Sequence, residues 1–376
     1  MRAARDDLSS HVRFMRAALV LARKGLGSTS PNPAVGAVIV RNKKIIAGGY
    51  HRKAGLPHAE AEALRVAGAA AKGAVLYVTL EPCCNWGRTP PCTEAIIRSG
   101  IKKVVAGMRD PNPGVSGRGT RALRAAGIEV VSGVLRDECG RINEGYIKHI
   151  TTGLPFVTLK LASTLDGRIA TSRGESKWIT GQEARGCVHR LRAINDAVMV
   201  GVSTVLKDDP ELTVRLARGR DPARVVLDST LRIPLSAKVF KEGARLLIFT
   251  TAGAVKSRAS MAADRGAEVI TVAGSKDGVD IKRVLTELGK RGVTSVLVEG
   301  GGRVAASLMK KGLADKLVLF ISPMALGSDG LPSIGPLGIK RLKDAPRLER
   351  MASRKIGSDI VLEGYFGHST AANGFS

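Results

Sequence analysis

The amino-acid sequence predicts two α/β domains: a three-layer α/β/α domain in the N-terminal half and a different α/β domain in the C-terminal half. Its 376 residues exceed the length at which a single hydrophobic core usually stops growing. Helical and strand patterns alternate in both halves, as they do in layered α/β folds. The segment 153–155 (GLP) interrupts this alternation. We therefore predict domains over 1–150 and 151–367, followed by a flexible tail over 368–376.

The first half contains the shorter alternation. Apolar residues at helical spacing and Ala/Glu-rich composition predict helices over 11–24, 59–70 and 92–99. Short apolar runs predict strands over 35–40, 74–80, 103–107 and 128–131. A Pro/Gly-rich loop at 110–119 and a further helix separate the last two strands.

The second half repeats the alternation with more strands. Apolar runs predict strands over 156–162, 196–200, 223–227, 244–249, 267–272, 294–298 and 316–321, with helices between most of them. The segment 359–366 is expected to add an edge strand.

Composition narrows the class of protein. The segment Met1 to Ser10 is charged and no apolar run reaches about 18 residues, so we expect a cytoplasmic protein without a membrane partner. The net charge of +26 allows nucleic-acid binding, but basic residues are scattered and only 3% of residues are aromatic. We favour a basic surface that attracts small phosphorylated substrates over a specific nucleic-acid partner.

The cysteines point to a metal rather than to disulfides, because three of the five crowd into residues 83–92. Together with His58, Cys83 and Cys92 offer zinc three ligands and leave a fourth position for water. We expect both cysteines at helix starts, where thiolates are stabilised. Glu60 suits a proton shuttle between that water and a departing amine. Cys84, Cys139 and Cys187 are interpreted as structural.

This His-x-Glu and Pro-Cys arrangement is typical of zinc nucleobase deaminases, although eight residues separate the two cysteines here instead of two. Two alternatives stay open at this point. One is a deaminase of bases in RNA or DNA, which leaves the C-terminal half without a purpose. The other is a non-catalytic, zinc-stabilised scaffold with a degenerate second half.

The sequence also resembles one family over nearly its whole length, the bifunctional riboflavin-biosynthesis deaminase/reductases. The resemblance rests on TLEPCCNWGRTPPC (79–92), DPNPGVSGRG (110–119), KLASTLDGRIA (160–170), DAVMVGVSTVLKDDPELTVR (196–215) and VEGGGRVAASL (298–308). It implies that domain 1–150 is a zinc-dependent pyrimidine deaminase with a cytidine-deaminase-like fold. It implies that domain 151–367 is an NADPH-dependent reductase with a dihydrofolate-reductase-like fold.

The implied reactions act successively on a phosphorylated pyrimidine ribotide: hydrolytic removal of the ring 2-amino group, then reduction of the ribosyl group to ribityl. By resemblance, His58, Cys83 and Cys92 bind one zinc ion and Glu60 moves the proton. The implied deaminase substrate contacts are Asn32, His51, Asn85 and Arg88. Asn85 replaces the histidine usual in the family, so we expect altered substrate affinity with the metal site retained.

In the reductase half, Glu299-Gly-Gly-Gly302 lies between a strand pattern and a helical pattern, where backbone N–H groups can hold a phosphate. On its own this cluster fits a plain tight turn equally well. The resemblance implies NADPH contacts at Ala162, Trp178, Thr204, Asp208, Ser229 and a loop comprising Gly301, Gly302, Arg303, Val304, Ala305, Ala306 and Ser307. It implies substrate contacts at Ser176, Arg192, Leu212, Arg215 and Glu299.

Two further expectations concern this half. Ser203 stands where the family commonly has Gly, which would tighten the cofactor turn without abolishing binding. His189 is interpreted as structural, and hydride transfer requires no protein nucleophile. We also expect the protein to be a homo-oligomer.

Overall fold

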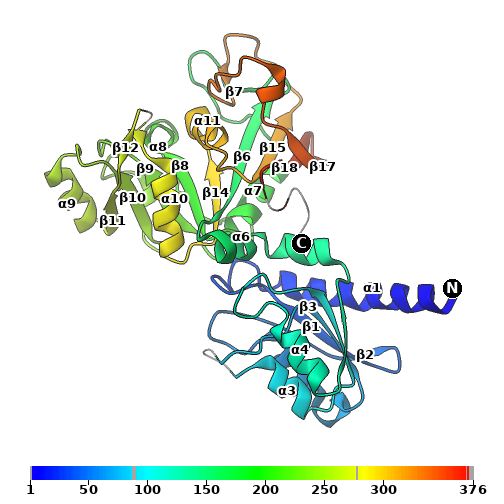
Figure 1. Ribbon diagram of the computed structural model, residues 1–376. Coiled ribbons are helices and arrows are strands. Elements are labelled where there is room, and N and C mark those ends of the chain that lie inside the picture. Colours follow the sequence, from blue (N-terminus) through cyan, green and yellow to red (C-terminus); the bar gives the residue numbers. More distant parts are fainter. Residues whose placement is uncertain (1, 87–89, 277, 370, 372–376) are drawn as a thin grey trace. The chain divides into compact units, whose positions relative to one another are not determined.

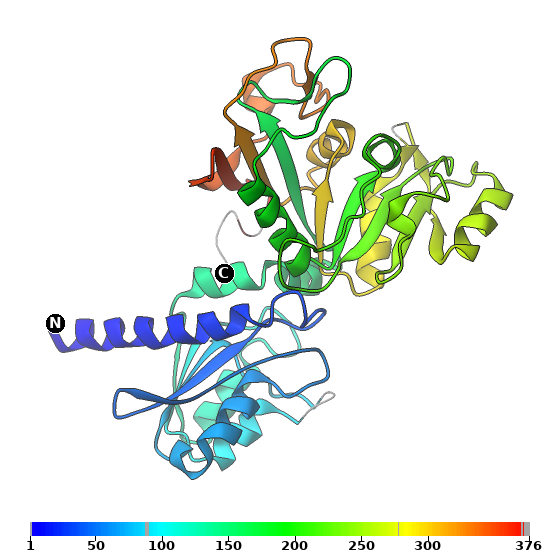
Figure 2. The same cartoon turned by 180° about the vertical axis from the view of Figure 1, so that it is seen from behind.

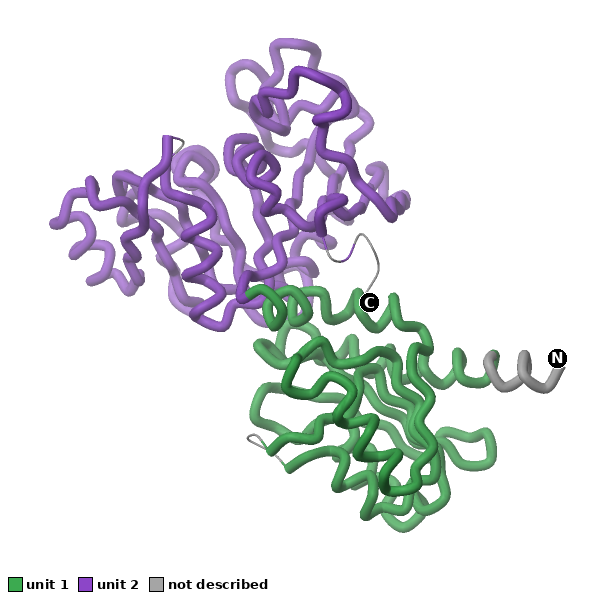
Figure 3. Tube along the Cα trace, viewed as in Figure 1, with its two compact units in different colours: residues 1–152, 374–376 green, residues 153–373 purple. Residues whose placement is uncertain are grey.

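The computed structural model describes residues 2–86, 90–276, 278–369 and 371. It divides the chain into two compact units, residues 1–152 with 374–376 and residues 153–373, which Figure 3 colours separately. The sheet of the first unit has five strands, and the main sheet of the second unit has nine.

The first unit is built on a mixed sheet with the strand order β2-β1-β3-β4-β5 (Figure 1). β1 pairs antiparallel with β2 and β3, whereas β3, β4 and β5 run parallel. The elements in chain order are α1 (Arg2–Arg23), β1 (Gly36–Arg41), β2 (Lys44–Tyr50), α2 (Ala59–Ala67), η1 (Gly68–Ala71), β3 (Val75–Leu80), α3 (Cys92–Arg98), β4 (Lys103–Met108), α4 (Arg118–Ala125), β5 (Glu129–Ser132), α5 (Arg136–Ile142) and α6 (Glu144–Thr152).

Helices cover both faces of this sheet, which confirms the predicted three-layer arrangement. α1 and α5 pack on one face, where Gly36 of β1 lies against α1 and Gly107 of β4 lies against Cys139 of α5. α2 packs on the other face and contacts α3, which in turn contacts α4. Within the described residues, no helix is both long and apolar enough to cross a membrane.

The sequence pattern does not predict β2, because its pair Gly48 and Gly49 is typical of a turn. Close packing explains these glycines. A Cβ atom on Gly49 would lie 2.5 Å from the carbonyl oxygen of Ala59 in α2, and one on Gly48 would lie 2.9 Å from a methyl carbon of Leu21 in α1. The strand therefore lies between helices on both faces, and its distance from α2 at Gly49 is one that only glycine allows.

The second unit contains a sheet with the order β11-β10-β9-β8-β14-β6-β15-β18-β17. The strands from β11 to β15 run parallel, and β18 and β17 complete the sheet in antiparallel pairing. The elements are β6 (Phe156–Thr164), β7 (Arg168–Ala170), α7 (Gln182–Ile194), β8 (Ala197–Gly201), α8 (Val202–Asp208), β9 (Ala223–Leu227), η2 (Lys238–Phe240), β10 (Leu246–Thr250), α9 (Lys256–Asp264), β11 (Ala267–Thr271), β12 (Gly274–Ser275), β13 (Gly278–Val279), α10 (Ile281–Lys290), β14 (Ser295–Glu299), α11 (Gly302–Lys310), β15 (Lys316–Ser322), β16 (Leu331–Pro332), η3 (Leu342–Asp344), β17 (Leu348–Ile356) and β18 (Asp359–Phe366).

Neighbouring residues of these strands contribute to cores on opposite faces of the sheet. Figures 1 and 2 show the sheet and its helices from two sides. Met199 packs with Leu285 of α10 on one face, whereas Val200 packs with Val205 of α8 on the other. Because both faces are covered, the strands are apolar at nearly every position. This burial explains why short continuous apolar runs predicted them.

The direction in which the chain crosses the sheet reverses between the neighbouring strands β8 and β14. After β8 the chain proceeds outward through β9, β10 and β11, whereas after β14 it proceeds the other way to β15. In open parallel sheets, ligands bind at the carboxyl ends of strands at such a reversal. The segments that follow β8 and β14 are therefore the expected position of a ligand site.

One expectation about the C-terminal part needs correction, whereas the flexible tail stays a prediction. Residues 359–366 do form β18, but β18 lies between β15 and β17, so the prediction of an edge strand there is wrong. The true edge, β17, was missed because its sequence LERMASRKI is charged and exposed along nearly all its length. Of the predicted tail, only residues 368, 369 and 371 are described. Ser369 is buried, and its N–H donates to the carbonyl oxygen of Phe366 at 2.8 Å.

We predict that Gly36→Ala destabilises the first unit. The new Cβ atom would lie 2.1 Å from the carbonyl oxygen of Ala18 and 2.5 Å from the amide nitrogen of Ala22, so α1 would have to move. Overpacking of this kind costs about 1–3 kcal/mol. Hydrogen exchange measured by mass spectrometry should show faster exchange in β1. Gly186→Ala is the control, because its Cβ would meet Arg190 only at 3.9 Å. Unchanged protection of β1 would contradict the prediction.

Candidate active sites

One imidazole and two thiols converge in the first unit. The ligand atoms of His58, Cys83 and Cys92 all lie within 4.8 Å of one another. Nδ1 of His58 lies 3.3 Å from Sγ of Cys92 and 3.5 Å from Sγ of Cys83. One nitrogen and two sulfur donors suit zinc and leave one tetrahedral position for a further ligand. The structure thus brings together the three residues that the sequence pattern singled out.

Three different segments deliver these atoms. His58 immediately precedes α2, Cys92 is the first residue of α3, and Cys83 lies in the loop after β3. The expectation that both cysteines begin helices is therefore wrong for Cys83. Instead, its loop lies against the first turn of α3. The N–H of Cys92 donates to Sγ of Cys83 at 3.4 Å, and the N–H of Thr93 donates to the carbonyl oxygen of Cys83 at 3.2 Å.

The pKa values of the two thiols are shifted in opposite directions. The hydrogen bond from Cys92 lowers the pKa of Cys83 against the opposing effect of burial, and His58 lowers it further. The same hydrogen bond, together with burial, raises the pKa of Cys92. The hydrogen bond with Cys83 also raises the pKa of His58. One sulfur is thus held as a thiolate, the form of cysteine that binds metals.

Glu60 lies beside this cluster in the first turn of α2 and is almost fully buried. Burial and, secondarily, the negative charge of Cys83 raise the pKa of Glu60 to about 7. A carboxyl group with a pKa near the working pH can both accept and release a proton.

Asn32 and His51, two predicted pyrimidine contacts, lie next to the same cluster. Nδ2 of Asn32 is 3.2 Å from Nε2 of His51, and Nδ1 of His51 is 3.1 Å from the carbonyl oxygen of Pro57. Burial lowers the pKa of His51, which favours the neutral ring. A neutral ring that donates from Nδ1 to Pro57 accepts the Asn32 amide at Nε2. The ring of His51 meets that of His58 edge-on, with 5.2 Å between centroids.

The other two predicted deaminase contacts are placed differently. Arg88 lies outside the described residues. Asn85 is exposed, and its Nδ2 donates to the carbonyl oxygen of Gly114 at 2.8 Å. Sγ of Cys84 lies 3.5 Å from Oδ1 of Asn85. Asn85 therefore connects the loop after β3 to the loop that follows β4.

Glu81 is a residue that the sequence reasoning missed. Its carboxylate is buried and accepts backbone N–H groups from Asp110 at 3.3 Å, Gly117 at 2.9 Å and Thr120 at 2.9 Å. Because Glu81 lies two residues before Cys83, it ties the loop after β4 to the loop that carries Cys83. The one available signal was its position beside Pro82 and Cys83.

In the second unit, Arg192 and Glu299 form a bidentate ion pair. Nε and Nη2 of Arg192 donate to the Glu299 carboxylate at 2.6 and 2.8 Å, and Nη1 donates to the carbonyl oxygen of Thr213 at 2.9 Å. Burial alone would raise the pKa of Glu299, but Arg192 reverses this and lowers it. Both predicted substrate residues are thus brought together, with the guanidinium of Arg192 already bound on three nitrogens.

Lys160 adjoins this pair and was also missed. It lies opposite Glu299 in the pairing of β6 with β14, and its Nζ is 5.8 Å from the ring centre of Phe320. Burial lowers the pKa of its amine, while the charge of Glu299 opposes that effect. Lys160 carries no periodic signal, because a single lysine in the apolar run 156–162 resembles a solvent-facing strand position.

Arg215, a further predicted substrate contact, is exposed and lies close to the same pair. Its Nη1 donates to Glu211 at 2.8 Å and to Oγ1 of Thr213 at 2.6 Å. Its backbone N–H donates to Nδ1 of His189 at 2.9 Å. Burial, aided by nearby arginine charges, lowers the pKa of His189, so the ring accepts this hydrogen bond in its neutral form. The structural role expected for His189 agrees with this contact.

The segments after β8 and β14 meet at the reversal in strand order. A Cβ atom on Gly300 would lie 3.0 Å from Oγ1 of Thr204, and one on Gly201 would lie 3.2 Å from a methyl carbon of Val304. Gly300 and Gly301 have φ angles of 83° and 75°, which favour glycine. The close contact therefore places the N-terminus of α11 beside that of α8.

The predicted cofactor loop 301–307 is a helix instead. α11 begins at Gly302, and Ala305 and Ala306 are buried, so their side chains belong to the core. The apolar spacing of VAASL in this segment favours a helix over a loop. Gly301 and Gly302 are left at the positive end of α11, where N–H groups can bind an anion.

The remaining predicted contacts are spread over several segments. Ser229 follows β9, and its carbonyl oxygen accepts the N–H and hydroxyl of Thr251 at 3.3 and 2.9 Å. Trp178 is 69% exposed and stacks on the guanidinium of Arg185 at 4.3 Å. The others are Ala162 in β6, half-buried Ser176 before Trp178, Asp208 at the end of α8, and buried Leu212 with a φ of 55°.

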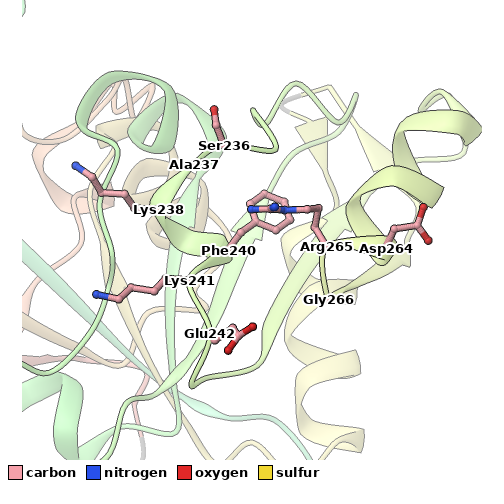
Figure 4. A pocket seen from close by; sticks show the side chains of 9 residues that line it. All are labelled: Ser236, Ala237, Lys238, Phe240, Lys241, Glu242, Asp264, Arg265 and Gly266. Carbon is pink, nitrogen blue, oxygen red and sulfur yellow. The ribbon is translucent and has the colours of Figure 1, made fainter.

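A cavity of about 640 Å³ lies elsewhere in this unit (Figure 4). Its lining includes Lys238, Lys241, Glu242 and Arg265. Glu242 precedes β10 and Arg265 precedes β11, so the cavity lies at the amino ends of these parallel strands. The glycines after β14 lie at the carboxyl ends. The cavity is therefore separate from the site predicted by the strand order.

Two family models match the chain. The model described as "Cytidine and deoxycytidylate deaminase zinc-binding region" matches residues 8–108, and "RibD C-terminal domain" matches residues 155–362. The riboflavin biosynthesis protein RibD of Aquifex aeolicus is 47% identical over 93% of this chain and 96% of its own length. RibD of Escherichia coli is 40% identical over 93% of this chain and 97% of its own length.

The chain belongs to the RibD family. Among solved structures, RibD of Acinetobacter baumannii has 38% identity and a TM-score of 0.86, covering 96% of this chain and 99% of that chain. A Thermotoga maritima protein described as a diaminohydroxyphosphoribosylaminopyrimidine deaminase/5-amino-6-(5-phosphoribosylamino)uracil reductase has 40% identity, a TM-score of 0.84 and the same coverage. This chain is a riboflavin-biosynthesis enzyme with deaminase and reductase activities, which confirms the predicted family.

We predict a pH-dependent stability effect at Asp110, whose carboxylate accepts the Tyr146 hydroxyl at 3.0 Å. Burial raises its pKa from 3.8 to about 6. Between these values the unfolded chain releases this proton while the folded chain keeps it, so this residue makes folding less favourable as the pH rises. Well above pH 6 the penalty becomes constant, at about 3 kcal/mol.

Asp110→Asn should remove this penalty. Relative to the wild type, the variant should therefore gain stability between pH 4 and pH 7, measured as the difference in thermal unfolding midpoint. Asp264→Asn, at an exposed position at the end of α9, is the control. A difference between Asp110→Asn and wild type that does not change with pH would refute the prediction.

Proposed function

We propose that this chain catalyses two successive steps of riboflavin biosynthesis. The first is hydrolytic deamination of 2,5-diamino-6-(5-phosphoribosylamino)pyrimidin-4(3H)-one, and the second is NADPH-dependent reduction of 5-amino-6-(5-phosphoribosylamino)uracil. The convergence of His58, Cys83 and Cys92 beside buried Glu60 is the observation that carries the first assignment. The described activity of the Thermotoga maritima relative supports both substrates.

We assign the deaminase to residues 1–150 and the reductase to residues 151–367. The division of the chain between Thr152 and Gly153 and the two family matches support this boundary. Action in the cytoplasm and assembly into a homo-oligomer stay predictions from the sequence.

In the deaminase, His58, Cys83 and Cys92 would hold zinc, and their nitrogen and sulfur donors fit that ion. When bound there, zinc activates water for attack at neutral pH. Glu60, with a pKa near 7, takes a proton and delivers it to the departing amine, so that ammonia leaves. Asn32 and His51 orient the pyrimidine through their paired side chains, with Asn85 and Arg88 completing the substrate contacts.

In the reductase, the glycines before α11 and Thr204 after β8 would hold the cofactor phosphates at the reversal in strand order. The backbone of residues 301–307, whose Ala305 and Ala306 side chains face the core, completes the proposed NADPH site together with Ala162, Trp178, Asp208 and Ser229. NADPH supplies the hydride. Arg215 binds the ribose phosphate, Glu299 is oriented by Arg192, and Ser176 and Leu212 line the substrate site.

Glu60→Gln tests the proton-transfer role. We predict that ammonia release from the diaminopyrimidine ribotide falls about 10²- to 10⁴-fold, the range typical of a lost general acid–base. Zinc content and reductase activity should be unchanged, because the ligands and the second unit are intact.

Cys92→Ser should lose both zinc and deaminase activity, whereas the neighbouring control Cys84→Ser should keep both. A Cys92→Ser enzyme with normal zinc and deaminase activity would overturn the ligand assignment.

Arg215→Ala tests the phosphate contact without leaving a buried charge unpaired, since Arg215 is exposed. We predict that the KM for 5-amino-6-(5-phosphoribosylamino)uracil rises about 10- to 100-fold, as expected from loss of a charged hydrogen bond. The KM for NADPH and the deaminase activity should not change. Arg218→Ala removes the same charge from a nearby exposed position and is the matched control. Equal kinetics in the two variants would rule out this role for Arg215.

A further inference from the structure

We infer that Asn143 is a positioning residue of the deaminase site: its amide fixes the backbone of the loop that carries Asn32. Oδ1 of Asn143 accepts the N–H of Ala34 at 2.8 Å, and Nδ2 donates to the carbonyl oxygen of Ala34 at 3.1 Å. Both residues are buried. One side chain thus satisfies both backbone groups of a residue 109 positions earlier in the chain. This inference rests on the proposed pyrimidine site.

The loop that is held in this way leads directly to the site. Ala34 lies two residues after Asn32, whose amide contacts His51 at 3.2 Å. The N–H of His51 donates to the carbonyl oxygen of Val35 at 2.9 Å, so the next residue along is bound as well. A displacement of the backbone at Ala34 would therefore be passed to both Asn32 and His51. Small displacements of substrate-orienting groups have large kinetic effects.

Asn143 itself is held rigidly at the junction of two helices. It caps the C-terminus of α5, where its N–H donates to the carbonyl oxygen of Gly140 at 2.9 Å. Its own carbonyl oxygen accepts the N–H of Ile147 in α6 at 2.8 Å. α5 is fixed on the sheet because Sγ of Cys139 lies 2.3 Å from the position that a Cβ atom on Gly107 would occupy.

The position of Asn143 in the chain makes the contact informative. The match to the deaminase zinc-binding region ends at residue 108, so Asn143 belongs to the segment that follows that region. In the deaminase half, α5 and α6 therefore have a second role besides packing in the core. These helices supply the group that sets where the pyrimidine contacts lie relative to the metal ligands.

The test compares steady-state deaminase kinetics of the full-length zinc enzyme with those of its variants, using the diaminopyrimidine ribotide and measuring ammonia release. For Asn143→Ala we expect KM to rise about tenfold with kcat nearly unchanged. Zinc content and reductase activity should match the wild type. Hydrogen exchange at residues 33–36 should become faster.

Tyr77→Phe is the matched control, because it removes another buried hydrogen bond of the same unit, the one between Tyr77 and His11 at 2.9 Å. It should lower stability without raising KM. If Asn143→Ala does not fold, Asn143→Asp keeps the acceptor for the Ala34 N–H but places a second acceptor against the Ala34 carbonyl oxygen, so KM should again rise. An unchanged KM in the folded Asn143 variant, or an equal rise in Tyr77→Phe, overturns the inference.

Asn32→Ala separates this inference from the proposed site on which it rests. If Asn32→Ala raises KM but the Asn143 variants do not, the pyrimidine site stands and the positioning role of Asn143 is overturned. If Asn32→Ala leaves KM unchanged, the proposed pyrimidine contact and the role of Asn143 are overturned together.

Discussion

Parallel strand pairing is the constraint on which both candidate sites depend. Parallel neighbours end at the same edge of a sheet, so the segments that follow them meet there even when they are far apart in sequence. In the first unit, β3 leads to Cys83 and β4 leads to the loop that starts near Asp110. In the second unit, β8 leads to Thr204 and β14 leads to Gly301. The two chemistries thus use the same architectural solution on sheets of different size.

Buried polar contacts then hold these segments in place. Glu81 binds three backbone N–H groups of the loop after β4 and the start of α4, and Asn143 binds both backbone groups of Ala34. Leaving a buried backbone group unsatisfied costs about 1–3 kcal/mol. Breaking a buried pair such as Arg192 with Glu299 costs about 3–5 kcal/mol. The site loops are therefore parts of the folded core. Moving them out of place would break these contacts and lower the stability of the protein.

Prediction from the sequence worked where one local pattern had one physical interpretation. The apolar runs at 74–80 and 294–298 are strands, because continuous burial on both faces selects such runs. Prediction failed where packing against segments distant in the chain determined which residue stands at a position. Gly49 resembles a turn residue but lies in a strand that packs against α2. The strand at 348–356 has no apolar run that would predict it, because nearly all its residues are exposed. Glu81 and Lys160 carry no periodic signal, because their partners come from other elements.

The sequence by itself determined which chemistry is present: an imidazole, two thiols and a carboxylate in one half, and a glycine cluster after an apolar strand in the other. Those residue types have intrinsic affinities for zinc, protons and phosphate that do not depend on the fold. Only the tertiary structure decided which atoms meet, how deeply Glu60 is buried, and that Arg192 binds Glu299. Distances and desolvation depend on segments that are brought together by the sheets, and a linear pattern contains neither.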